Sequence, residues 1–153
     1  MKLSELLGEE NIVSELTARD KRTVLEELVE AIINSNSSVE KQSLVKVLLE
    51  RERLGSTGIG DGVAIPHGKY PDLEQPLISF GRSIEGLDFE SMDGQPAHLF
   101  FLLVAPENSA NIHLKALATI ARILKNSSFR KALMEATSSQ EIYQRIAQYD
   151  EEF

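Results

Sequence analysis

Residues 98–105 read His-Leu-Phe-Phe-Leu-Leu-Val-Ala and contain the longest uninterrupted apolar run of the chain, Leu99 to Ala105. A membrane-spanning helix needs about 20 apolar residues, so this run is too short to be one. It suits a strand that is covered on both faces, because such a strand has no polar side to present to water. We therefore expect a central β-strand here, with shorter strands at 63–65 and 77–83.

Before these strands, apolar residues recur at helical spacing in two stretches and predict two helices. Thr17 with Asp20 approximates a capping box in front of the first helix, and Ser37 with Glu40 forms a fuller one in front of the second. Gly55 follows the second helix, in the position where a glycine commonly ends one. We therefore expect two helices to open the fold.

The last third of the chain is also predicted to be helical. Apolar residues at helical spacing from Leu114 to Leu124 predict one helix, with Asn108 and Ser109 as capping candidates. A short helix is expected over 126–136, and a capping box at Ser138–Glu141 precedes a final one. Helices at both ends of a strand-rich middle predict an α/β fold, a mixed β-sheet flanked by helices in a single domain.

The composition excludes several kinds of site and partner. The chain has 153 residues and a net charge of −8, and an acidic surface repels the phosphates of a nucleic acid. It has no cysteine, which excludes disulfides, thiolate zinc sites, iron–sulfur clusters and cysteine nucleophiles. No signal peptide or spanning segment is visible, so we expect a cytoplasmic protein without membrane insertion. The acidic end, Asp150 to Glu152, is expected to be frayed.

His67 is the histidine with the most unusual surroundings, Gly62-Val-Ala-Ile-Pro-His-Gly68. Proline ends a strand ladder because it has no N–H, and glycine permits a tight turn or the close approach of a ligand. The order strand, proline, histidine, glycine predicts an imidazole displayed at a strand end. This position fits a functional histidine and an ordinary loop histidine equally well.

The other two histidines have different surroundings. His113 lies near the expected start of the helix that ends at Leu124, where free N–H groups favour an anion such as phosphate; a first-turn ring that faces water is the alternative. His98 opens the apolar strand and is expected to make a local hydrogen bond without a catalytic role. The three histidines lack a short zinc-ligand spacing, so no metal is expected, and a three-histidine metal-dependent hydrolase is a further alternative. The glycine run 55–62 matches no nucleotide-binding fingerprint.

Three segments resemble the enzyme IIA domains of the bacterial phosphoenolpyruvate-dependent phosphotransferase system, of the fructose/mannitol type. They are Arg51-Glu-Arg53, the run from Gly55 through Pro66-His67-Gly68 to Lys69, and Ile112-His113-Leu114-Lys-Ala-Leu117. Within that type, the chain is most similar to the free-standing nitrogen-regulatory (PtsN-like) branch. The resemblance covers nearly the whole chain. It implies that residues 1–153 form a single enzyme IIA-type domain with a mixed β-sheet flanked by helices.

The resemblance also implies roles for individual residues. His67 matches the histidine that is phosphorylated, His113 matches the second active-site histidine that supports the phosphoryl group, and Arg51 matches the arginine that stabilises the phosphate. Arg53 lies close enough in sequence to be the alternative to Arg51. The phosphoryl donor is then an HPr-like histidine phosphocarrier, and the reaction requires no metal, nucleotide or other cofactor.

Three functions remain open at this point. The first is a regulatory phosphocarrier whose phosphorylation state controls effector proteins in nitrogen or general metabolism. The second is a sugar-branch enzyme IIA that passes the phosphoryl group to a separate enzyme IIB cysteine; the chain itself has no cysteine for such a step. The third is a binding module that keeps the fold and is not phosphorylated. The sequence leaves the oligomeric state open.

Overall fold

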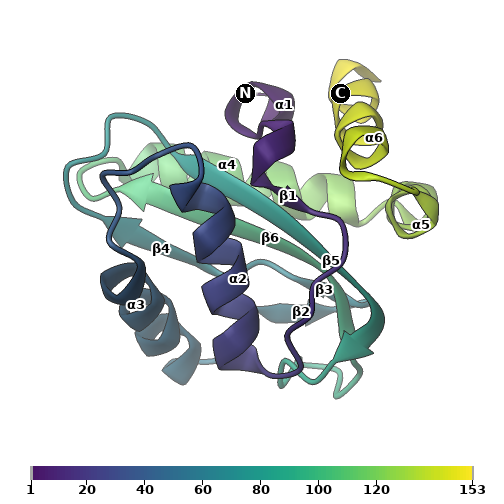
Figure 1. Cartoon of the computed structure of the whole chain (residues 1–153), viewed down its shortest axis with the longest axis horizontal. Helices are drawn as coiled ribbons and strands as arrows, with labels where there is room; N and C mark the ends of the chain where they lie inside the picture. Colours follow the sequence, from purple (N-terminus) through teal and green to yellow (C-terminus); the bar gives the residue numbers. More distant parts are fainter. Residues whose placement is uncertain (1, 153) are drawn as a thin grey trace.

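The computed structural model describes residues 2–152 as a mixed β-sheet with helices on both faces (Figure 1). The middle of the sheet is β6 (Ala97–Pro106), which pairs antiparallel with β5 (Leu77–Leu87) on one side and parallel with β3 and β4 on the other. β1 runs parallel to β5, and β2 runs antiparallel to β3. The remaining strands are β1 (Ile12–Val13), β2 (Gly58–Gly60), β3 (Val63–Ala64) and β4 (His67–Tyr70).

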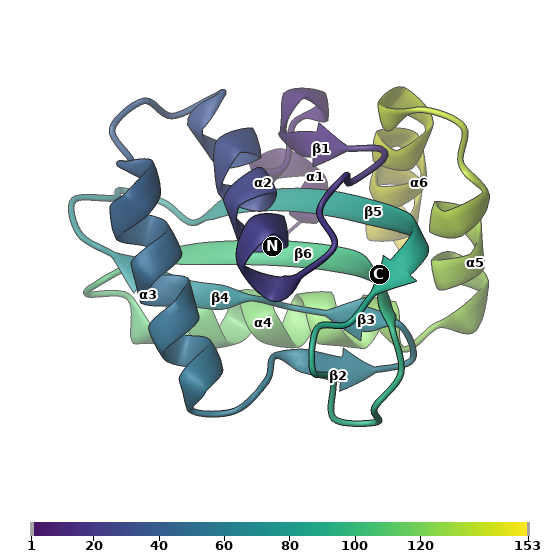
Figure 2. The ribbon, with the colours of Figure 1, turned by 60° about the horizontal axis from the view of Figure 1, so that its bottom comes forward.

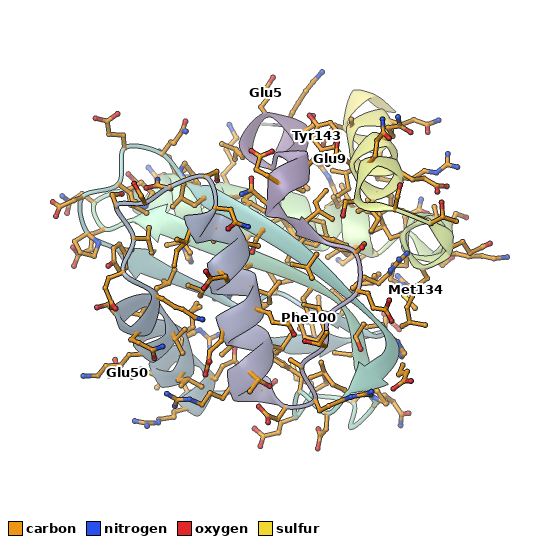
Figure 3. The ribbon with its side chains drawn as sticks, in the orientation of Figure 1. Glu5, Glu9, Glu50, Phe100, Met134 and Tyr143 are labelled. Carbon is orange, nitrogen blue, oxygen red and sulfur yellow. The ribbon has the colours of Figure 1, made fainter. Side chains whose placement is uncertain are left out.

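The apolar run of β6 is buried because both faces of the strand are covered. Side chains alternate between the two faces of a strand. Phe101 and its neighbours on one face belong to a core shared with α4 to α6, whereas Phe100 on the other face belongs to a core shared with α2 and α3. Figure 3 shows Phe100 in the interior beside α2, while Glu5 and Glu50 point away from the protein. The prediction of a central strand and a mixed sheet is confirmed.

The helices lie in two layers (Figure 2). α2 and α3 cover one face of the sheet, and α4 covers the other face together with α5, α6 and the short α1. None of the helices in the described range 2–152 combines the length and the apolar sequence needed to span a membrane. The helices are α1 (Leu3–Leu6), α2 (Lys21–Ile33), α3 (Lys41–Arg53), α4 (Ala110–Leu124), α5 (Ser127–Glu135) and α6 (Ser139–Glu152), with a 3₁₀ turn, η1, at Glu9–Asn11.

The two predicted helices, α2 and α3, do not open the fold, because α1, η1 and β1 precede them. Both also begin later than their predicted capping boxes. The side chain of Asp20 accepts a hydrogen bond from the Thr23 N–H (2.9 Å), so Asp20 itself is the N-cap of α2. Glu40 caps α3 in the same way through the Ser43 N–H (2.6 Å). An extended N-cap residue whose carboxylate reaches the N–H three residues on satisfies a free donor, and this decides the boundary. The predicted end of α3 is confirmed, because Gly55 follows the C-cap residue with a φ of +146°.

The helix predicted from Leu114 to Leu124 is confirmed as α4, but its apolar residues are not all buried. Ile120 and Leu124 are buried, whereas Leu114 is 64% exposed. The prediction for the end of the chain is wrong at Asp150. Asp150 is not frayed: it lies in α6, is buried, and accepts a hydrogen bond from the Ser4 N–H (2.7 Å). The N-terminal helix α1 therefore packs against α6 and holds the end of the chain in place.

Candidate functional site

His67 is the first residue of β4, at an edge of the sheet where the chain passes from β3 through Pro66. The sequence suggested a tight turn at the glycine after the histidine. The structure shows no turn there, because the chain continues as a strand parallel to β6. Gly68 faces α3, where a Cβ would lie 2.9 Å from the Cγ1 of Val47. The glycine is therefore needed for the close packing of β4 on α3, and the alternation of the strand directs His67 to the opposite face.

The imidazole of His67 is held by one short hydrogen bond. Nδ1 lies 2.7 Å from the carbonyl oxygen of Ile65. A carbonyl oxygen only accepts, so Nδ1 carries the proton of the neutral ring and the lone pair of Nε2 stays free. Burial lowers the pKa of His67, as does the charge of Arg51, against the opposing effects of the Ile65 hydrogen bond and of Glu52. The ring is therefore a neutral imidazole with an available Nε2.

His113 lies in the first turn of α4, as predicted, and its ring faces that of His67. The two ring centroids are 5.4 Å apart, with an angle of 59° between the planes. Burial lowers the pKa of His113, and repulsion from a protonated His67 and from the charge of Lys69 lowers it further. The backbone N–H of His113 donates to the Ser109 carbonyl (3.0 Å). The residue therefore offers its imidazole to the site, and not a free backbone N–H.

One atom of His113 has no partner within the described residues: the buried Nδ1 makes no hydrogen bond there. Buried polar atoms in proteins almost always have a partner, so an exception needs an explanation, and a catalytic or ligand-binding role is one such explanation. This nitrogen lies on the ring that faces His67. The histidine pair is thus a site with unused hydrogen-bonding capacity.

Arg51 lies in the last turn of α3, and its Nη1 donates to the Gly55 carbonyl oxygen (2.9 Å). Its charge acts on His67. Arg53 is exposed and lines a different recess, between α2 and α3, together with Arg22 and Lys46. Of the two arginines that the sequence left open, the structure places the charge of Arg51 within electrostatic range of His67.

Lys69 is a second cation at this site that the sequence analysis did not assign to it. It lies two residues after His67 on β4, so the strand directs both side chains to the same face. Its charge lowers the pKa of His113. The signal for Lys69 is the period-two alternation of β4, which becomes usable only when residues 67–70 are known to form a strand.

His98 does not join the other two histidines. It lies in β6, and its Nδ1 is 3.0 Å from the carbonyl oxygen of Ser83, which confirms the expected local hydrogen bond. Among residues 2–152, no group of three or more histidine, aspartate or glutamate side chains is placed to hold a metal ion. The three-histidine metal site is therefore not formed by these residues.

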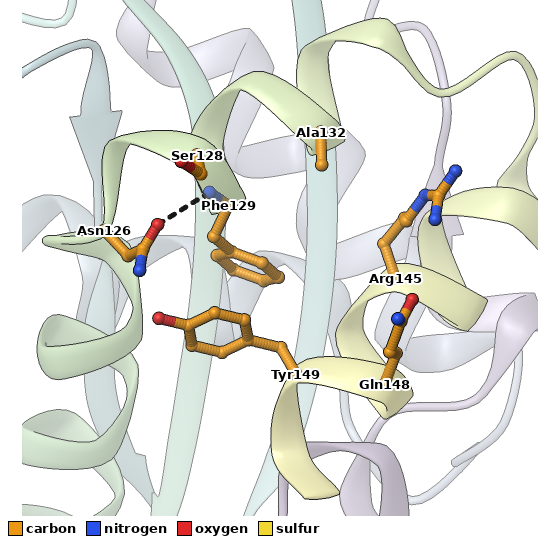
Figure 4. A pocket seen from close by; sticks show the side chains of 7 residues that line it. All are labelled: Asn126, Ser128, Phe129, Ala132, Arg145, Gln148 and Tyr149. Carbon is orange, nitrogen blue, oxygen red and sulfur yellow. Dashed lines mark hydrogen bonds between the residues drawn. The ribbon is translucent and has the colours of Figure 1, made fainter. Parts of the chain in front are cut away.

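A recess between α5 and α6 lies apart from this cluster (Figure 4). Its volume is about 280 Å³, and the rings of Phe129 and Tyr149 stack beside it with centroids 4.4 Å apart. The Phe129 N–H donates to Asn126 (3.0 Å), which caps α5. The lining residues are Asn126, Ser128, Phe129, Ala132, Arg145, Gln148 and Tyr149. None of them belongs to the His67–His113 cluster.

Comparison with known proteins identifies the family. Residues 5–149 match the family described as phosphoenolpyruvate-dependent sugar phosphotransferase system, EIIA 2. The chain belongs to this family. The resemblance noted in the sequence is thereby confirmed, and the chain is an EIIA-type phosphocarrier of that system.

Two relatives and one solved structure show which EIIA proteins this chain is similar to. It is 44% identical over 147 residues to the nitrogen regulatory protein of Bradyrhizobium diazoefficiens, covering 96% of this chain and 95% of that protein. It is 41% identical over 150 residues to the fructose-specific EIIABC component of Bacillus subtilis, covering 98% of this chain and only 24% of that relative. The crystal structure of nitrogen regulatory protein IIA-Ntr from Neisseria meningitidis superposes with a TM-score of 0.87 at 34% identity, covering 94% of this chain and 98% of that one.

Proposed function

We propose that this EIIA protein accepts a phosphoryl group on Nε2 of His67. The observation that carries the proposal is the 2.7 Å hydrogen bond from Nδ1 to Ile65, which leaves Nε2 as the nucleophile beside the ring of His113. A neutral imidazole is required, because an imidazolium has no free lone pair. The lowered pKa of His67, caused first by burial, favours that form.

The transfer needs no metal or nucleotide, because the high-energy bond is already formed on the donor. The Nε2 lone pair of His67 forms a new N–P bond while the N–P bond of a phosphorylated donor histidine breaks, and its electron pair returns to the donor imidazole. The transition state is loose and carries negative charge on the three equatorial oxygens. Arg51 is suited to hold these oxygens, and the imidazole of His113, whose ring lies beside that of His67, is suited to hydrogen-bond one of them.

We propose an HPr-like histidine phosphocarrier as the donor. Apolar side chains beside the site support a protein partner: Leu54 is 84% exposed, Leu114 64% and Ile112 38%. Ile112 and Leu114 adjoin His113 in sequence, and Leu54 follows the last turn of α3 that carries Arg51. Exposed apolar groups next to a reactive centre are typical of surfaces that bind another protein.

The output that we propose is regulation, in the cytoplasm, of effector proteins in nitrogen or general metabolism. Phosphorylation adds about two negative charges to the surface around His67 and so changes which partners fit it. The support is the 44% identity to a nitrogen regulatory protein over nearly its full length. The 41% identity to a fructose-specific component supports a second candidate, the transfer of the phosphoryl group to an EIIB cysteine.

The test is incubation with phosphoenolpyruvate, enzyme I and an HPr-like carrier, followed by intact-mass measurement. We expect the gain of one acid-labile phosphoryl group, its loss in His67→Ala, and its retention in the control His98→Ala. A label that persists in His67→Ala contradicts the site assignment. A wild-type protein that gains no mass favours the unphosphorylated binding module. Rapid loss of the label to an added EIIB domain favours the sugar branch over regulation.

A further inference from the structure

Glu52 is a buried carboxylate that the proposed transfer does not use. The residue is 8% exposed, yet it adjoins Arg51 in the last turn of α3. The ammonium of Lys21 lies 3.0 Å from its Oε1, and the backbone N–H of Thr57 donates to the same oxygen (3.1 Å). The hydroxyl of Thr57 donates to Oε2. A buried charge is costly unless it is paired and hydrogen-bonded. The ion pair with Lys21 and the two hydrogen bonds from Thr57 meet this requirement at Glu52.

A chain of hydrogen bonds leads from this carboxylate to the imidazole of His67. Glu52 holds Thr57 at both its N–H and its hydroxyl. The carbonyl of Thr57 accepts from the Ile65 N–H (3.0 Å), and the carbonyl of Ile65 accepts from Nδ1 of His67 (2.7 Å). Thr57 is 3% exposed and Ile65 is 4% exposed, so water does not compete for these bonds. The position of Glu52 is thus transmitted to the ring that receives the phosphoryl group.

The carboxylate is itself anchored from outside the site. Lys21 is the first residue of α2, and its side chain is 15% exposed. Its ammonium also pairs with Glu90 (3.1 Å) and lies 4.8 Å from the ring centroid of Phe89. Glu52 therefore joins three parts of the fold at one point: the start of α2, the end of α3 that carries Arg51, and the segment at Thr57 that leads to His67.

We propose that Glu52 is a positioning residue for phosphoryl transfer, which through Thr57 and Ile65 holds His67 in the Nδ1–H tautomer with Nε2 directed at the donor. The catalytic part of this inference rests on the proposed function of His67; the effect on the ring does not. The charge of Glu52 also raises the pKa of His67, against the effects of burial and of Arg51.

The test compares three variants of the full chain with a matched control. Glu52→Ala removes the acceptor for Thr57, Glu52→Gln keeps an acceptor oxygen without the charge, and Thr57→Val removes only the hydroxyl donor. The control is Ser79→Ala, which removes another buried hydrogen bond, from Ser79 to the Leu28 carbonyl (2.8 Å), away from His67. Two measurements are made: the tautomer and titration of His67 by ¹⁵N NMR in the unphosphorylated protein, and the rate of phosphorylation over a range of carrier concentrations.

We expect Glu52→Ala to populate both tautomers of His67 and to lower the saturating rate by about tenfold or more, because small misplacements of reacting groups have effects of that size. The carrier concentration at half-maximal rate should stay unchanged. Glu52→Gln should restore most of the rate and the tautomer, with the His67 titration shifted to lower pH. The rate and the tautomer population of Thr57→Val should lie between those of Glu52→Ala and Glu52→Gln. Ser79→Ala should lose thermal stability and keep the wild-type rate and tautomer.

The inference is overturned if Thr57→Val and a folded Glu52→Ala keep both the wild-type tautomer and the wild-type saturating rate, or if Ser79→Ala changes them as much. If Glu52→Ala does not fold, Thr57→Val and Glu52→Gln decide the question. A failure of the proposed function is recognised separately, since the wild-type protein would then not be phosphorylated while the NMR measurement would still test the positioning of His67.

Discussion

Replacing Gly68 by alanine tests whether β4, the strand that begins with His67, is closely packed on α3. The added Cβ would lie 2.9 Å from Val47 Cγ1 and 3.5 Å from Leu48 Cδ2. Valine in a helix has one strongly preferred rotamer, so Val47 cannot swing away and the helix or the strand must move. Overpacking of this kind costs about 1–3 kcal/mol. For a chain of this size, at about 2–4 °C per kcal/mol, Tm should fall by about 2–12 °C.

The control for this substitution is Gly8→Ala. The nearest atoms to its added Cβ belong to the flexible end of the Glu10 side chain, which can move away, so Tm should stay unchanged. The double variant Val47→Ala/Gly68→Ala supplies the second check. Removal of Val47 Cγ1 relieves the overlap, so in a double-mutant cycle the two substitutions should be less destabilising together than the sum of their separate effects. Scanning calorimetry measures the four proteins of the cycle and the Gly8→Ala control. The reasoning is refuted if Gly68→Ala is as stable as Gly8→Ala, or if the cycle shows no coupling.

Three other substitutions probe the site and the ends of the chain. Lys69→Ala should raise the pKa of His113, because the charge of the lysine lowers that pKa in the wild type. An NMR titration of the His113 ring should therefore show a midpoint at higher pH. An unchanged midpoint would show that Lys69 does not belong to the site. The buried guanidinium of Arg82 donates hydrogen bonds to the carbonyls of Ser14, Leu133 and Ala136. Arg82→Met leaves these carbonyls unsatisfied, so urea unfolding should show a loss of about 3 kcal/mol or more. A loss below about 1 kcal/mol would show that water takes the place of the guanidinium. Asp150→Ala should cost about 1–2 kcal/mol and expose α1 to proteolysis, because the carboxylate holds the Ser4 N–H; an equally protected α1 would contradict this.

The sequence predicted the elements that carry a long pattern. The apolar run of β6 and the helical periodicities of α3 and α4 are local signals, and the structure has all three elements. β1, β2 and β4 have two to four residues, too few to show a period, and they exist because a neighbouring strand pairs with them. The strand predicted over 77–83 continues to Leu87 as β5, past Gly86, which has a φ of +82° where the pairing register shifts.

The candidate site was predicted residue by residue, but not as an arrangement. His67 and His113 each stood out from their local surroundings, whereas the 5.4 Å between their rings follows from the packing of α4 on the sheet. Lys21 and Glu52 were not predicted as a pair. They come from different helices, and a single lysine or glutamate in a helix is usually a solvated surface residue. Such pairs become visible only when tertiary contacts are known.

For the proposed function, the edge position of β4 explains how the site would meet two opposing requirements. An acceptor imidazole must be neutral, which burial favours, and it must also be reached by a protein donor, which burial prevents. His67 lies at an edge of the sheet, partly buried, with Arg51 supplied by α3 and His113 by α4 on the other face. The charges of Arg51 and Lys69 lower the pKa values of the two imidazoles.

On the proposed reaction, these same charges act twice. Before transfer they disfavour the imidazolium form of His67 and so keep the Nε2 lone pair free. After transfer they attract the oxygens of the phosphoryl group bound to Nε2. Glu52 opposes them at His67, but its carboxylate is paired with the ammonium of Lys21, which Glu52 shares with Glu90. A net positive site in a protein of charge −8 should therefore accept a phosphoryl group faster at low ionic strength, since salt screens exposed charges. Lys69→Ala should weaken that salt dependence, and Arg53→Ala, outside the site, should not.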